Sequence, residues 1–173
     1  KIQKVIFTLN SKLHVIGKSA FKCSSIRSIT FPSQLASIED EAFLLCESLQ
    51  TVEIPSNCEL QTIGCKAFFG TAIEKICIPA QLTHICESAF ENCANLQKVE
   101  IPKNSKLQII EKHAFSNSLI ESFTIPASTE KLKEECFYNM SKLKKIEVDS
   151  NCKYYSKIND KIIVGKSSKE KVN

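Results

Sequence analysis

The residues of this sequence that could do chemistry are nine cysteines and three histidines. Thiols can pair as disulfides, bind zinc or act as nucleophiles, and imidazole can bind zinc or transfer a proton. Nine is an odd number, so the thiols cannot all pair within one chain. There is no C-x-x-C, H-E-x-x-H or G-x-S-x-G motif, and four glycines are too few for a phosphate loop. The sequence therefore predicts no catalytic, cofactor-binding or metal-binding residues.

The scaffold that positions these side chains is a repeat. Successive prolines lie 23 or 24 residues apart, and successive phenylalanines lie 22 or 25 apart. The residues concerned are Pro32, Pro55, Pro79, Pro102 and Pro126, and Phe21, Phe43, Phe68, Phe90, Phe115 and Phe137. Units of this length that bury an apolar side only by stacking on one another are typical of solenoids.

Each unit carries the same three apolar segments. Before the proline comes a triplet such as Leu96, Val99 and Ile101, whose last two members have the period of a strand. A pair such as Leu82 and Ile85 follows the proline, and then an Ala-Phe step. We predict that the triplets form one parallel sheet, and that the residues around Ala-Phe form short helical or 3₁₀ turns on the outer arc.

Two segments closely match a known repeat pattern, L-x-x-I-x-I-P followed by A-F-x-x-C: Leu96–Pro102 and Ala89–Cys93. These residues resemble the BspA-like class of leucine-rich-repeat surface antigens. The resemblance implies an α/β repeat solenoid, a right-handed superhelix of about seven coils over residues 1–150 with its parallel sheet on the concave face. Residues 151–173 resemble the segment that follows the last repeat, which implies a cap hairpin from Tyr154-Tyr155 and Ile162–Val164 and then a lysine-rich tail.

The cysteines fall at different places in the repeat. Counted back from the strand, Cys23, Cys46 and Cys93 share one column, for which we predict buried structural thiols; a disulfide between Cys23 and Cys46 stays geometrically conceivable. Cys77 lies in mid-strand and should point outward. Cys86 is two residues from His84, but no third residue orients the two, so a Cys-His dyad is disfavoured.

The charge excludes some functions. Of the net charge of +4, residues 131–173 contribute 11 lysines against 6 acids, and residues 1–130 are close to neutral. The only arginine is Arg27 and there is no tryptophan, so we expect no nucleic-acid face. No apolar run approaches the ~20 residues that span a bilayer, and we expect no membrane insertion by these residues. The chain begins at Lys1 without an initiator Met, which we interpret as a fragment or processed piece.

The remaining candidate is the exposed face of the predicted sheet. Its partner-binding residues are the polar ones that flank the central apolar residue of each strand: Lys4, Ser28, Thr30, Thr51, Glu53, Lys75, Cys77, Lys98, Glu100, Ser122, Thr124, Lys145 and Glu147. Curved repeat surfaces commonly bind proteins in this way, although a merely solvated face fits the pattern equally well.

The resemblance implies a non-catalytic protein-recognition module, a surface or secreted antigen or adhesin that binds a host or extracellular-matrix protein. Two alternatives stay open. Nine cysteines would suit an intracellular scaffold, because reducing compartments keep thiols unpaired. The repeat could also be a passive spacer without a specific partner.

Overall fold

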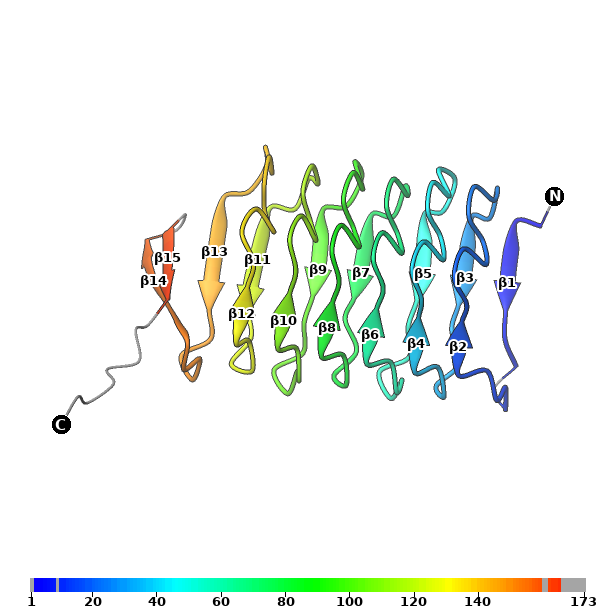
Figure 1. Cartoon of the computed structure of the whole chain (residues 1–173), viewed down its shortest axis with the longest axis horizontal. Coiled ribbons are helices and arrows are strands. Elements are labelled where there is room, and N and C mark those ends of the chain that lie inside the picture. The colour runs from blue at the N-terminus through cyan, green and yellow to red at the C-terminus, as the bar shows by residue number, and fades with distance from the viewer. Residues whose placement is uncertain (1, 9, 160–161, 166–173) are drawn as a thin grey trace.

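The computed structural model describes residues 2–8, 10–159 and 162–165, and these form short strands joined by tight turns (Figure 1). Odd-numbered strands end at or just before the proline position: β1 (Lys4–Ile6), β3 (Ser28–Thr30), β5 (Thr51–Glu53), β7 (Lys75–Cys77), β9 (Lys98–Glu100), β11 (Ser122–Ile125) and β13 (Lys145–Val148). Even-numbered strands follow it: β2 (Val15–Ile16), β4 (Ser37–Ile38), β6 (Thr62–Ile63), β8 (His84–Ile85), β10 (Ile109–Ile110) and β12 (Lys131–Leu132).

The strands form two rows rather than the single sheet we predicted. The even-numbered strands β2 to β12 make one continuous six-stranded parallel sheet, and the odd-numbered strands β1 to β13 pair in three parallel groups, β1-β3-β5, β7-β9 and β11-β13. In Figure 1 the two rows point in opposite directions. The second row escaped prediction because each of its strands has only two residues, too few to display the alternation that identifies a strand.

The predicted helical or 3₁₀ turns are wrong, because the described residues contain no helix. Around the Ala-Phe step, backbone N–H groups alternate between two kinds of acceptor. Phe43 donates to Ala67 of the next coil, whereas Ala42 and Leu44 donate to carbonyls three residues earlier. A helix would direct every N–H to its own coil. Residues two before and two after each phenylalanine also have φ between 53° and 67°, which interrupts any helix.

The core lies between the two rows and is built from one layer per coil. The apolar strand residues and the Ala-Phe step are almost all fully buried from Ile26 to Ile125. The phenylalanine rings stack from coil to coil: the centroids from Phe21 through Phe115 lie 5.0–5.3 Å apart, with ring planes within 5° of parallel. The repeated Phe thus forms a continuous aromatic column along the solenoid.

The C-terminal end of this core is covered by an antiparallel pair, β14 (Tyr155–Asn159) with β15 (Ile162–Gly165). The Tyr155 hydroxyl accepts a hydrogen bond from the backbone N–H of Leu132 at 2.8 Å, on the outermost strand of the six-stranded sheet. This contact satisfies an N–H at a sheet edge that would otherwise face solvent. Residues 166–173, which include the lysine-rich tail, lie outside the described residues.

Candidate functional site

The polar residues predicted for the sheet face lie on the odd-numbered strands. The central residue of each strand packs into the core, as Ile29, Val52 and Ile76 do, so its two neighbours point away from it. Of the thirteen predicted residues, Ser28, Thr30, Glu100 and Glu147 are half-buried and the others are exposed. Whether a partner binds them stays a prediction.

The strand groups bring some of these residues together and separate others. Lys75 pairs in register with Lys98, and Cys77 with Glu100, because β7 and β9 form one ladder. No strand pairing joins β5 to β7 or β9 to β11, although β5 and β7 are neighbours. The predicted face is therefore divided into three segments by two seams, one between units 48–71 and 72–94 and one between units 95–118 and 119–141.

Charges at the centre of this face largely neutralise one another. The Glu100 carboxylate lies 2.8 Å from the Lys75 Nζ and 2.7 Å from the Lys98 Nζ, and it accepts a hydrogen bond from the Cys77 Sγ at 3.2 Å. Hydrogen bonds from Lys75, Lys98 and Cys77 lower the pKa of Glu100 to about 2. Glu147 is similarly paired with Lys145 and Lys157. The face is thus a polar strip with paired charges, not a cationic surface.

The pairing of Glu100 predicts a pH dependence. Its pKa falls from the ordinary value of 4.5 to about 2 on folding, so the ionised carboxylate favours the folded state at neutral pH. That contribution is complete above about pH 4.5 and is lost as the pH falls toward 2. We expect the NMR titration of the Glu100 side chain to have its midpoint near 2 and to move up in the Lys98→Met variant; a midpoint of 4.5 in the unmodified chain would contradict the pairing.

A hollow of about 540 Å³ lies at the carboxyl ends of β5, β7 and β9. Its apolar part comes from the residues at and beside the prolines: Ile54, Ile78, Pro79, Ala80, Ile101 and Pro102. Ser56, Cys77, Glu100 and Asn104 complete it. A second hollow of about 380 Å³ shares Ile54 and Cys77 with the first and lies along β5 and β7. An apolar floor thus adjoins the polar strip.

The sequence prediction missed this hollow, although a signal for it was present. Two residues separate Pro79 from Leu82, whereas four separate Pro55 from Leu60 and four separate Pro102 from Leu107. The short loop at Ala80 lies between two longer loops, and Ser56 and Asn104 of these longer loops line the sides of the hollow. Here the short loop between two long loops leaves a recess in the surface.

The cysteines only partly follow prediction. Cys46 and Cys93 are buried and donate to the carbonyl oxygens of Phe21 (2.8 Å) and Phe68 (3.1 Å), and Cys77 is exposed as expected. Cys23, in contrast, is exposed and has a φ of 54°. The distance from the repeated Phe to the first apolar residue of the next strand alternates between five and six residues. Counting back from the strand therefore put Cys23, two residues after Phe21, in the same column as Cys46, three residues after Phe43.

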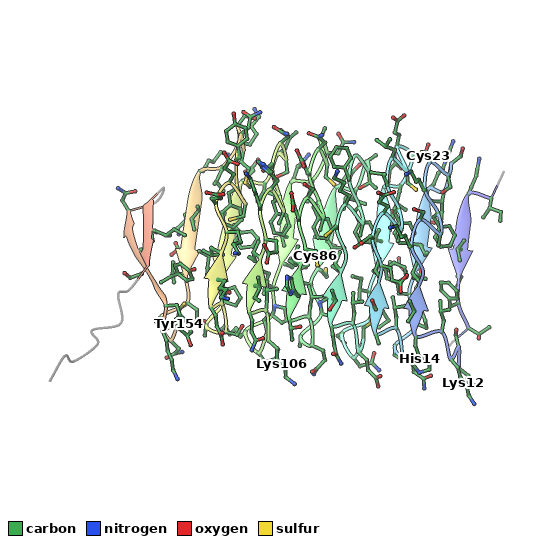
Figure 2. The ribbon with its side chains drawn as sticks, viewed as in Figure 1. Lys12, His14, Cys23, Cys86, Lys106 and Tyr154 are labelled. Atoms are coloured by element: carbon green, nitrogen blue, oxygen red, sulfur yellow. The ribbon has the colours of Figure 1, made fainter. Side chains whose placement is uncertain are left out.

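The column of Cys23 is instead one of left-handed turn residues, and Figure 2 shows Cys23 near the upper turns. Asn92, Asn117 and Asn139 belong to it, and their side-chain amides form a ladder with N–O distances of 2.8 Å. Asparagine tolerates positive φ better than most residues, which explains its recurrence there. Cys23 and Cys46 thus lie in different columns, and both thiols are free.

Cys86, which is two residues from His84 in the sequence, is not ionised at neutral pH. Burial, with smaller contributions from Cys65 and Asp40, raises the pKa of Cys86 to about 12, so this thiol is protonated at neutral pH. The Nε2 atom of His84, on β8, lies 3.5 Å from the Glu111 carboxylate. Within the part of the chain that the structure describes, no three His, Cys, Asp or Glu side chains are grouped to hold a metal ion. The described residues also include no helix long and apolar enough to cross a membrane.

The two rows of parallel strands and their stacked apolar layers define a solenoid repeat protein. The chain belongs to the BspA type leucine-rich repeat family, whose model matches six copies over residues 1–60 and 61–163. This family is a leucine-rich repeat, generally a non-enzymatic fold for protein interaction. No curated protein sequence matches the chain.

Three solved structures share the fold. The pneumococcal vaccine antigen PcpA is 24% identical, with a TM-score of 0.85 over 95% of this chain and 44% of that one. A leucine-rich cell surface protein from Faecalibacterium prausnitzii is 20% identical (TM-score 0.66; 96% of this chain, 52% of the other). The T. pallidum leucine-rich repeat protein TpLRR is 19% identical (TM-score 0.55; 84% and 58%). The chain spans about half the length of these proteins.

Proposed function

We propose that this chain is a non-catalytic protein-recognition module of a microbial cell surface, and that it binds a host or extracellular-matrix protein through the face of β5, β7 and β9. The observation that carries the proposal is the hollow at the carboxyl ends of these strands. Its apolar floor can take an apolar side chain of a partner, and the polar strip beside it offers hydrogen-bond partners. Protein interfaces combine an apolar centre and a polar rim in this way.

The chemistry of the face favours a protein over a nucleic acid. The central lysines, Lys75 and Lys98, are already paired with Glu100, which leaves little net charge to attract phosphates. The exposed strand residues include no arginine and no aromatic residue for stacking on bases. Two proteins of similar fold are named a vaccine antigen and a cell surface protein, and these names support a surface role for this chain.

The hollow can be tested by filling it. Ala80 is half-buried in the short loop of the hollow, so Ala80→Tyr places a ring in the space that a partner side chain would occupy. We expect this variant to bind matrix proteins or host cells at least about tenfold more weakly, the loss that corresponds to about 1.4 kcal/mol. Binding is measured by surface plasmon resonance on a panel of immobilised matrix proteins and by adhesion of labelled protein to host cells.

The matched control is Ala94→Tyr, which adds the same ring to an exposed turn away from the strand face. Equal affinity of the two variants would remove the hollow from the proposal, and no binding by the unmodified chain would favour a passive spacer. Location is tested separately with an antibody to this domain. Staining of intact source cells supports a surface role, whereas staining that requires permeabilisation would favour an intracellular scaffold.

A further inference from the structure

Cys65 and Cys86 lie on adjacent coils on the side of the continuous six-stranded sheet. Ile63 of β6 pairs in register with Ile85 of β8, which places the two cysteines just beyond the paired residues. The Cys86 N–H donates to the Ile63 carbonyl, and the Lys66 N–H donates to the Glu87 carbonyl, both at 3.0 Å. Cys86 follows Ile85 by one residue and Cys65 follows Ile63 by two, so the cysteines are diagonal neighbours on adjacent coils. With strands about 4.8 Å apart and a rise of about 3.3 Å per residue, their Cα atoms are roughly 6 Å apart, within the range of about 4.4–6.8 Å that disulfides join.

The corresponding positions one coil earlier show the direction of the Cys86 side chain. A Cβ at Gly64, in the column of Cys86, would lie 2.6 Å from the backbone N and 2.8 Å from the Oδ1 of Asp40, which is in the column of Cys65. Cys65 is close enough to contribute to the raised pKa of Cys86. Cys65 is exposed and Cys86 is half-buried, so a small oxidant in solution can reach the first. Figure 2 shows Cys86 at the middle of the molecule, away from Cys23.

We propose that Cys65 and Cys86 are a disulfide-forming pair that links the units 48–71 and 72–94 under oxidising conditions. The oxidant is a small-molecule disulfide such as oxidised glutathione. The Cys65 thiolate attacks one sulfur of this disulfide, the S–S bond breaks, and one glutathione thiolate leaves. Cys86 then loses its proton and attacks the Cys65 sulfur, releasing the second glutathione thiolate. The two protons lost by the cysteines convert both leaving groups to thiols, and two electrons pass from the protein to the oxidant.

The order of attack follows from the environment of each thiol. The raised pKa of Cys86, about 12, keeps it protonated near neutral pH, so the exposed Cys65 reacts first. The second step limits the rate, and the reaction accelerates as the pH rises toward the pKa of Cys86.

The other thiols are less suited to this reaction. Four are buried and have carbonyl oxygens or hydroxyls as neighbours: Cys46, Cys58, Cys93 and Cys152. Cys136 is also buried. Cys77 lies on the strand face and donates to Glu100. Cys23 is exposed and lies in the column of left-handed turn residues. One cross-link between Cys65 and Cys86 leaves an odd number of free thiols, as the count of nine requires.

The position of the cross-link gives it a mechanical consequence. It joins the same two units between which β5 and β7 lack strand pairing. The odd-numbered side of this seam is held without ladder hydrogen bonds, whereas the bond would fasten its even-numbered side. Oxidation should therefore restrict separation of the two units at the hollow.

The test uses the reduced chain incubated with oxidised glutathione at pH 8 and then alkylated in denaturant. We expect two fewer alkylated thiols than in the reduced protein, and a cross-linked tryptic peptide pair that joins residues 28–66 to residues 76–98. The Tm should rise by about 5 °C or more and return to its starting value on reduction.

The controls separate this pair from the other exposed thiols. Cys65→Ser and Cys86→Ser should each abolish the cross-link and the shift in Tm, whereas the double variant Cys23→Ser/Cys77→Ser should retain both. Full alkylation after oxidation, or a cross-link that persists in Cys65→Ser, would overturn the proposal. These readouts do not depend on the proposed recognition function, because no binding partner enters the experiment.

Discussion

Replacing Phe90 by alanine is expected to lower the free energy of unfolding by about 3–5 kcal/mol. Phe90 is fully buried, and its ring stacks between Phe68 and Phe115 at centroid distances of 5.2 and 5.3 Å. Truncation removes the apolar contacts of one ring and interrupts the aromatic column, and neighbouring coils cannot close the cavity because backbone hydrogen bonds fix their spacing. Urea denaturation followed by circular dichroism measures the loss.

Tyr138→Ala is the matched control for Phe90→Ala. The Tyr138 side chain follows the same Ala-Phe position of a later coil but is 58% exposed, so its removal should change the free energy of unfolding by less than about 1 kcal/mol. A loss below 1 kcal/mol for Phe90→Ala as well would mean that the column does not bear on stability.

Gly64→Ala is expected to destabilise the chain by about 1–3 kcal/mol through overpacking. A Cβ at this position would lie 2.6 Å from the backbone N of Asp40 and 2.7 Å from the carbonyl carbon of Glu39. Both atoms belong to the backbone of the preceding coil and cannot rotate away. The Asp40 Oδ1, which accepts the N–H of Cys65 at 2.8 Å, would also be displaced. Thermal unfolding of the variant gives the cost.

Gly17→Ala tests whether this cost comes from the close approach. Gly17 occupies the same column, but the nearest atom to its Cβ would be the flexible Glu39 Oε2 at 3.9 Å. We expect Gly17→Ala to be neutral or slightly stabilising, because alanine reduces the freedom of the unfolded chain. Equal losses at the two glycines would exclude steric contact as the cause.

The sequence predicted those parts of the fold that every repeat encodes in the same way. The proline and phenylalanine columns located the odd-numbered strands from β3 to β11 and the buried Ala-Phe step, because identical residues recur at identical places in each coil. The family followed from the same residues. The predicted helical turns failed for a non-local reason: a short stretch such as Glu41–Cys46 has good helix formers, but half of its N–H groups find acceptors on the next coil.

Prediction of the candidate site was less complete, because its features arise between units. The alternation of strand residues placed Lys75, Lys98 and Glu100 on one face. It did not reveal that Glu100 pairs with both lysines, since this depends on side-chain conformations across a ladder. The missing pairing between β5 and β7 likewise has no mark in either strand's own sequence. Differences in unit length did mark the hollow, but only as a relation among three consecutive loops.

The alternation of short and long loops has a consequence for how such a protein evolves. Around the Ala-Phe step, each coil donates alternate N–H groups to the coil that follows, so these turns use the same bonds at successive junctions, and a duplicated unit can be joined there in the same way. Duplicating one unit, however, would place two short or two long loops side by side. Duplicating a short and a long unit together preserves the alternation and copies the recess with it. The inheritable element of this surface is therefore a pair of repeats, and the number of recesses can grow with gene length.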